Sequence, residues 1–136
     1  MSTKLTLSQF KGTNIKTPFE IMRANAIIDA NMDIRGLSLI NFNLTTFLKR
    51  GREEDAYFIL SFWAIAPIKH QAQKFIQNPQ AGQQALIKRT EKLIERLAER
   101  EDTSDYFLET VFTRMTQHIN RTLSKICPDY DIAQSA

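Results

Sequence analysis

The sequence predicts an all-α fold, a single domain built as a bundle of about five to six helices. The chain of 136 residues suits one domain, and its 43% hydrophobic and 24% charged residues are typical of a globular chain with a core. Four glycines and four prolines leave few residues for the tight turns of an all-β fold. Apolar residues that recur at spacings of three and four favour helices instead.

Residues 1–16 are predicted to form an N-terminal arm without a long helix. The segment Thr6–Gln9 has the form of a capping box, and Gly12 follows it, which indicates a single helical turn. The alternative is an extended stretch over Lys4–Leu7, where polar and apolar residues alternate. The sequence does not decide between these two local structures.

The first long helix is predicted over residues 17–31. Its start, TPFE at residues 17–20, combines an N-cap threonine, a proline at the first helical position and the glutamate of a capping box. Apolar residues at helical spacing then continue to the end of this range. Residues 33–36 are interpreted as a connection to the next element.

The apolar segment 37–48 predicts a short helix near its end. Asn41 or Asn43 is a suitable N-cap, and Gly51 follows two basic residues as a C-terminal glycine commonly does. A short strand over residues 37–42 is the alternative, although the sequence offers no second strand to pair with it.

A central helix is predicted from residue 53, where three acidic residues, 53–55, favour a helix N-terminus. The segment 56–66 is apolar on every side of a helix except for one serine. Pro67 must kink this helix or begin the next one, which continues over 68–77. Residues 78–82 (NPQAG) mark the clearest break in the chain.

Two amphipathic segments, 83–101 and 102–126, predict a C-terminal antiparallel helical hairpin. A short polar connection joins them, so their apolar stripes should face each other. Pro128 ends the second helix, and residues 129–136 are predicted to be a loose tail. The expected stripes contain Leu86, Thr90, Leu93, Ile94 and Leu97 in one helix and Phe107, Leu108, Val111, Phe112, Met115, Ile119, Leu123 and Ile126 in the other.

Charge is unevenly distributed along the chain. Residues 1–52 carry eight Lys/Arg against three acidic residues, whereas residues 53–136 carry ten against twelve. This asymmetry suggests an acidic partner, and a solvated positive surface is the alternative. The single cysteine, Cys127, allows no disulfide within the chain, and no apolar run approaches the length of a membrane span. We therefore expect a cytoplasmic protein with no membrane span.

Catalytic machinery is not evident in the sequence, and the protein is predicted not to be an enzyme. The glycines are scattered, which excludes a phosphate-binding loop and a dinucleotide fingerprint. His70 and His118 are far apart, and neither has an acidic residue three or four positions away. That spacing excludes the helical zinc and di-iron motifs. No cofactor and no metal ion are predicted.

The aromatic residues of the central helix are the candidate protein-binding surface. Because segment 57–65 covers the whole circumference of a helix, we expect that one small bundle does not enclose it completely. The sequence thus predicts a non-enzymatic adaptor, assembly factor or regulatory subunit that binds a protein partner and self-associates. The residues expected at this surface are Tyr57, Phe58, Phe62 and Trp63, with Phe62 and Trp63 as the first anchors.

Nucleic-acid binding is an alternative function from a different class. Basic residues recur at spacings of three and four on the polar sides of the last two helices. If the hairpin sets the two rows side by side, they form a band that follows a phosphate backbone. The two rows are Lys88, Lys92, Arg96 and Arg100, and Arg114, His118, Arg121 and Lys125.

Two short stretches resemble parts of the tail-assembly chaperones of long-tailed phages. They are Thr6-Leu7-Ser8 and the run from Glu54-Asp55-Ala56 to Ser61-Phe62-Trp63, which together cover a small part of the chain. The resemblance implies a small helical protein that sequesters an apolar client during assembly. It carries over no catalytic residue.

Overall fold

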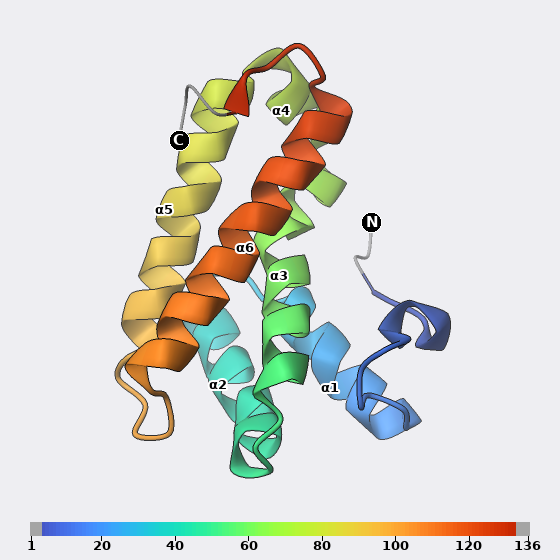
Figure 1. The fold of residues 1–136 in the computed structure, drawn as a ribbon, viewed down its shortest axis with the longest axis vertical. Helices are drawn as coiled ribbons and strands as arrows, with labels where there is room; N and C mark the ends of the chain where they lie inside the picture. The colour runs from blue at the N-terminus through green and yellow to red at the C-terminus, as the bar shows by residue number, and fades with distance from the viewer. Residues whose placement is uncertain (1–3, 133–136) are drawn as a thin grey trace.

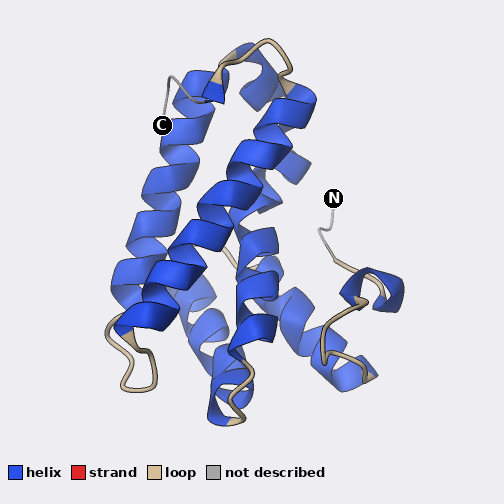
Figure 2. Cartoon of the chain, viewed as in Figure 1, coloured by secondary structure: helices blue, strands red, loops and turns tan. Residues whose placement is uncertain are grey.

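The computed structural model describes residues 4–132, and every regular element in that range is helical (Figures 1 and 2). The all-α bundle predicted from the sequence is confirmed. A short 3-10 helix, η1, precedes six α-helices. The elements are η1 (Leu7–Phe10), α1 (Pro18–Ile28), α2 (Ile34–Lys49), α3 (Glu53–His70), α4 (Ala72–Gln77), α5 (Pro79–Leu97) and α6 (Asp105–Ile126).

Local capping signals explain where several helices begin. Thr17 Oγ1 accepts a hydrogen bond from the Glu20 backbone N–H at 3.2 Å, which starts α1 as predicted. Ser104 Oγ accepts from the Phe107 N–H at 3.0 Å and starts α6. Asn78 accepts from the backbone of α5, so the break predicted there is also a helix start.

The second helix begins earlier than the sequence analysis predicts. Asp33 is its N-cap, because its Oδ1 accepts from the Gly36 N–H at 2.6 Å. The predicted connection over 33–36 and the alternative of a strand over 37–42 are therefore wrong, because α2 runs through both ranges. Gly36 serves close packing here, since a Cβ at this position would lie 1.6 Å from the Asn31 carbonyl oxygen. The preceding helix α1 ends at Ile28, short of the predicted end at Asn31.

Helix α3 is the centre of the bundle and packs against each of the other five α-helices (Figure 1). Helices α5 and α6 form the predicted antiparallel hairpin on one side of it, while α1 and α2 cover another side. Most residues of the predicted hairpin stripes are buried, and the half-buried ones are Ile94, Leu108, Phe112 and Ile126. Gln83 of α5 donates to Asn120 of α6 at 2.9 Å. The core therefore runs along the length of α3.

The N-terminal segment packs onto the bundle and covers part of α3. Leu5, Phe10 and Ile15 are all buried. The Asn25 side chain of α1 accepts from the Leu5 N–H at 2.8 Å and donates to the Leu5 carbonyl at 3.0 Å. At the other end, the Tyr130 hydroxyl donates to Gln83 at 2.6 Å. The last four residues of the predicted loose tail lie outside the described residues.

Trp63 lies fully buried where α1, α3 and α5 meet. Its indole N–H donates to the Ala30 carbonyl at 2.8 Å, just beyond α1. The Arg89 guanidinium carbon of α5 lies 3.4 Å from a Trp63 ring centroid, and its Nη1 donates to the Trp63 carbonyl at 3.0 Å. That carbonyl needs a side-chain donor because Pro67, four residues further along α3, has no N–H. Burial lowers the pKa of Arg89 to about 10, which leaves it charged at neutral pH.

This arrangement predicts thermodynamic coupling between Pro67 and Arg89. In the wild-type background, Arg89→Met should lower the free energy of unfolding by about 2 kcal/mol, because a buried carbonyl loses its donor and the cation–π contact is lost. In a Pro67→Ala background the same change should cost about 1 kcal/mol less, since the new backbone N–H donates to the Trp63 carbonyl. Urea unfolding of the four variants measures this difference.

The control for the cycle is Lys88→Met, which changes an exposed residue next to Arg89. It should alter the free energy of unfolding by less than about 0.5 kcal/mol in both backgrounds. If Arg89→Met lowers the free energy of unfolding equally with and without Pro67, Arg89 does not replace the donor that Pro67 lacks.

Candidate functional site

The aromatic segment of α3 is largely enclosed by the chain itself. Tyr57 and Trp63 lie in the core with 5% and 0% of their surface exposed, and Phe58 and Phe62 are half-buried. The Phe58 ring lies between those of Phe10 and Phe62, with centroid distances of 5.6 and 5.0 Å. Tyr57 and the expected anchor Trp63 are therefore not on the surface, whereas Phe58 and Phe62 keep part of their surface exposed, so the chain does not enclose the segment completely.

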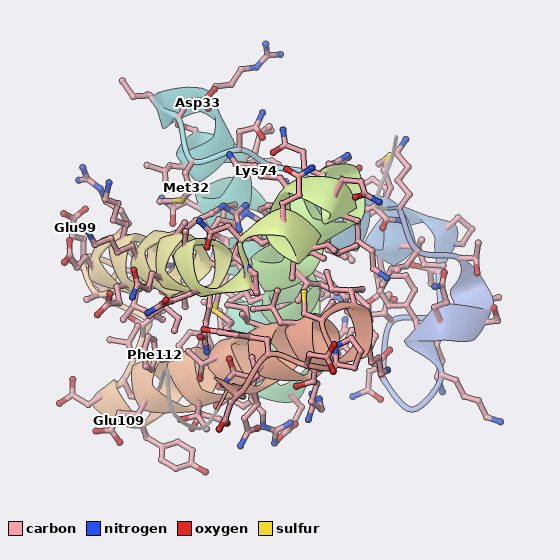
Figure 3. All side chains as sticks on the ribbon, turned by 90° about the horizontal axis from the view of Figure 1, so that it is seen from above. Met32, Asp33, Lys74, Glu99, Glu109 and Phe112 are labelled. Atoms are coloured by element: carbon pink, nitrogen blue, oxygen red, sulfur yellow. The ribbon has the colours of Figure 1, made fainter. Side chains whose placement is uncertain are left out.

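The two predicted basic rows lie on different sides of the α5–α6 hairpin. Phe112 lies on the side of α6 next to α5 (Figure 3). Arg114 is two positions further, about 200° round the helix, and lies 3.9 Å from Glu54 of α3. Arg100, the last member of the α5 row, donates to the Asn41 carbonyl of α2 at 2.9 Å. The rows therefore do not form one band. Their exposed members are Lys88, Lys92, Arg96, Arg114, Arg121 and Lys125.

His118 is the one partly buried member of the α6 row and faces α3. Its Nδ1 lies 2.9 Å from the Ser61 carbonyl oxygen. Because a carbonyl only accepts, Nδ1 carries the proton in the neutral ring and Nε2 is left as an acceptor. Burial lowers the pKa of His118, and neighbouring cations lower it further. The neutral ring is therefore the main form at pH 7.

Other reactive groups are placed for structure. Cys127 is buried with its thiol 3.7 Å from the Phe75 carbonyl, and burial raises the pKa of that thiol. A raised pKa disfavours the thiolate that acts as a nucleophile. Among residues 4–132, no three His, Cys, Asp or Glu side chains lie together as ligands for a metal ion.

A charged cluster joins the N-terminal ends of α1 and α3. Arg52 pairs with Glu20, and its Nε donates to Asp55 at 2.7 Å. Asp55 also accepts from the Asn14 backbone N–H at 3.1 Å, which fastens the N-terminal segment. The hydrogen bond from Arg52 lowers the pKa of Glu20 to about 2. These partners are already within the chain, so the cluster has a structural role.

Glu20 should make the stability depend on pH in the acid range. Its pKa in the folded chain lies below its usual value of 4.5, so Glu20 stabilises the fold above about pH 4.5 and loses this effect as the pH falls toward 2. We expect Glu20→Gln to be less stable than wild type at pH 7 and equal to it near pH 2. Urea unfolding from pH 7 to 2 measures the difference, with Glu91→Gln on α5 as an exposed control. A constant difference at every pH would contradict this role.

Helices α1 and α2 together present an apolar face that the sequence analysis did not identify. Phe19 and Met22 of α1 are 58% and 59% exposed, and Leu39 and Phe42 of α2 are 41% and 68% exposed. Arg23 lies between the two rings, its guanidinium carbon 4.7 Å from the Phe19 centroid and 5.5 Å from the Phe42 centroid. These five residues are called the α1–α2 face below.

Arg23 has no partner within the part of the chain that the structure describes. Its Nε is buried without a hydrogen bond, and no carboxylate lies within ion-pair distance. Glu20, one turn earlier on the same helix, is already bound by Arg52. The face therefore combines exposed apolar side chains with a cation that has no carboxylate partner among the described residues.

The α1–α2 face was missed because the start of α2 was misplaced. Once Asp33 is recognised as the N-cap, the helical period turns Ile40 and Leu44 inward and Leu39 and Phe42 outward. The sequence signal for this start was Asp33 itself, because an aspartate just before a helical segment is a common N-cap. Its side chain accepts the N–H of the residue three positions later, here Gly36.

Comparisons of the chain with protein-family models, curated proteins and solved structures gave no match in any of the three. None of the helices within residues 4–132 is both long and apolar enough to cross a membrane. The α1–α2 face holds four of the eight large apolar side chains that are exposed among these residues, and a fifth, Ile34, also lies on α2. It is therefore the candidate binding surface.

Proposed function

We propose that the chain is a non-enzymatic binding protein, an adaptor or assembly factor, that binds a protein partner through the α1–α2 face. One observation carries the proposal: four large apolar side chains are exposed on two adjacent helices, grouped around an unpaired guanidinium. Single exposed apolar residues are common on protein surfaces, whereas contiguous groups mark interaction sites.

The partner that fits this face is an amphipathic helical segment with a carboxylate among its apolar residues. Exposed apolar side chains on two neighbouring helices can bury the apolar side of a third helix. A carboxylate placed between Phe19 and Phe42 would pair with Arg23 away from water, where such a hydrogen bond is stronger. Arg35, exposed on α2, adds positive charge nearby.

Self-association through the same face is a less favourable arrangement. A two-fold dimer brings identical patches together, so each basic face would meet another basic face. The resemblance to tail-assembly chaperones implies an apolar client, which agrees with the apolar residues of the α1–α2 face. The cation adds the requirement that this client be acidic. We therefore favour a partner of different sequence over a second copy of this chain.

Binding to designed helical peptides tests the proposal. The acidic peptide carries Leu and Phe on one side and Glu beside them, and its basic isomer has Lys in place of Glu. We expect fluorescence anisotropy to detect binding of the acidic peptide, and Phe42→Asp to weaken it at least tenfold, about 1.4 kcal/mol. Tyr106→Asp is the matched control, because Tyr106 is 74% exposed and lies on α6, outside the face.

The control variant should bind the acidic peptide within about twofold of wild type, since it removes an equally exposed ring at a different place. Equal binding of the acidic and basic peptides would contradict the role of Arg23. Equal loss in both aspartate variants would show that the α1–α2 face is not the binding site.

A further inference from the structure

A groove of about 400 Å³ runs between α3 and α6 and is closed at one end by the loop after η1. Both of its long walls are helical, so its shape is set by the bundle rather than by a long loop. It lies apart from the α1–α2 face and shares no residue with it. The α3–α6 groove is lined by Lys11, Gly12, Thr13, Glu54, Asp55, Tyr57, Phe58, Ser61, Phe62, Arg114, His118 and Arg121.

Cations dominate the charge around this groove. Lys11 and Arg121 line it, and no carboxylate lies within ion-pair distance of either among residues 4–132. Its two acidic residues each have a basic partner, since Asp55 pairs with Arg52, which Glu20 shares, and Glu54 lies 3.9 Å from Arg114. That last pair is exposed and contributes little stability. An external anion would therefore meet a positive groove.

Further cations extend the positive charge beyond the groove. Lys69 of α3 and Lys125 of α6 lie close enough to act electrostatically on His118. Arg114 and Lys125 are eleven residues apart on α6, which corresponds to about 16 Å along the helix axis. A charge row of this length exceeds what one small anion needs, and it fits a ligand with repeated negative charges.

Aromatic side chains line part of the groove. The half-buried rings of Phe58 and Phe62 lie there, and His118 meets Phe62 edge-on with a centroid distance of 4.9 Å. The neutral His118 leaves its Nε2 as a hydrogen-bond acceptor, a suitable partner for an amino or imino group of a base. Cations beside aromatic rings are the combination that binds single-stranded nucleic acid.

We propose that the α3–α6 groove binds single-stranded nucleic acid, with Lys11, Arg121 and Lys125 on the phosphates and the rings of Phe58 and Phe62 beside the bases. A single strand is favoured over a duplex because the bases must reach rings that line a groove between α3 and α6, and the bases of a duplex are stacked inside it. This site does not depend on the function proposed for the α1–α2 face. It includes basic residues of the predicted α6 row and none of the α5 row.

Fluorescence anisotropy with a labelled 15-nucleotide oligothymidylate tests this site. The double variant Arg121→Glu/Lys125→Glu should weaken binding at least tenfold. The slope of log affinity against log salt concentration should become less steep by about 1.4, as expected for two lost phosphate contacts on a single strand. Lys88→Glu/Lys92→Glu is the matched control, because it makes the same charge change on exposed residues of α5. It should weaken binding by no more than about threefold, and Phe42→Asp should leave binding unchanged.

Three results would overturn the proposal. The first is the absence of oligothymidylate binding by the wild-type chain at about 50 mM salt, where phosphate contacts are strong. The second is an equal loss in the two glutamate double variants, which would indicate attraction by overall charge. The third is binding of a labelled 15-residue glutamate peptide as tight as that of the oligonucleotide, which would assign the groove to an acidic protein.

Discussion

The bundle depends on how one proline is accommodated inside its central helix. Pro67 removes a backbone N–H from α3, and Arg89 supplies the missing donor to the Trp63 carbonyl while its cation lies against the Trp63 ring. The same tryptophan donates to Ala30 at the end of α1. One aromatic side chain thus fixes both α1 and α5 against α3, and a charged group can be buried there because ring and carbonyl together replace its lost hydration.

Because the bundle buries much of the aromatic surface of α3, the surfaces that remain for binding partners lie mainly elsewhere. With Trp63 and Tyr57 in the core, five of the eight exposed large apolar side chains among residues 4–132 lie on α1 and α2, and none lies on α3. The two candidate surfaces differ in the physics of binding. The α1–α2 face would gain affinity by removing apolar area from water, with one ion pair for specificity. The α3–α6 groove would gain affinity by neutralising phosphates, and that affinity would fall steeply with salt.

Structural features that depend on a few neighbouring residues could be predicted from the sequence. The cap at Thr17 and most of the stripes of the α5–α6 hairpin depend on local spacing, so they were identified correctly. The start of α2 was predicted wrongly, because Gly36 is typical of a connection. Its real role is close packing on Asn31, which is a tertiary contact. The cover of Phe58 by Phe10 is also tertiary. No pattern within α3 reveals it, so the sequence could not show that Tyr57 and Trp63 are buried while Phe58 and Phe62 keep part of their surface exposed.

Trp63 is the only tryptophan in the chain, so its fluorescence reports on a single position. Acrylamide quenching, measured while the protein is diluted from micromolar to nanomolar concentration, tests most directly whether one subunit encloses this ring. The structure predicts weak quenching that does not change with dilution. Strong quenching that appears on dilution would mean that a second chain covers the ring, and it would return the binding surface to α3.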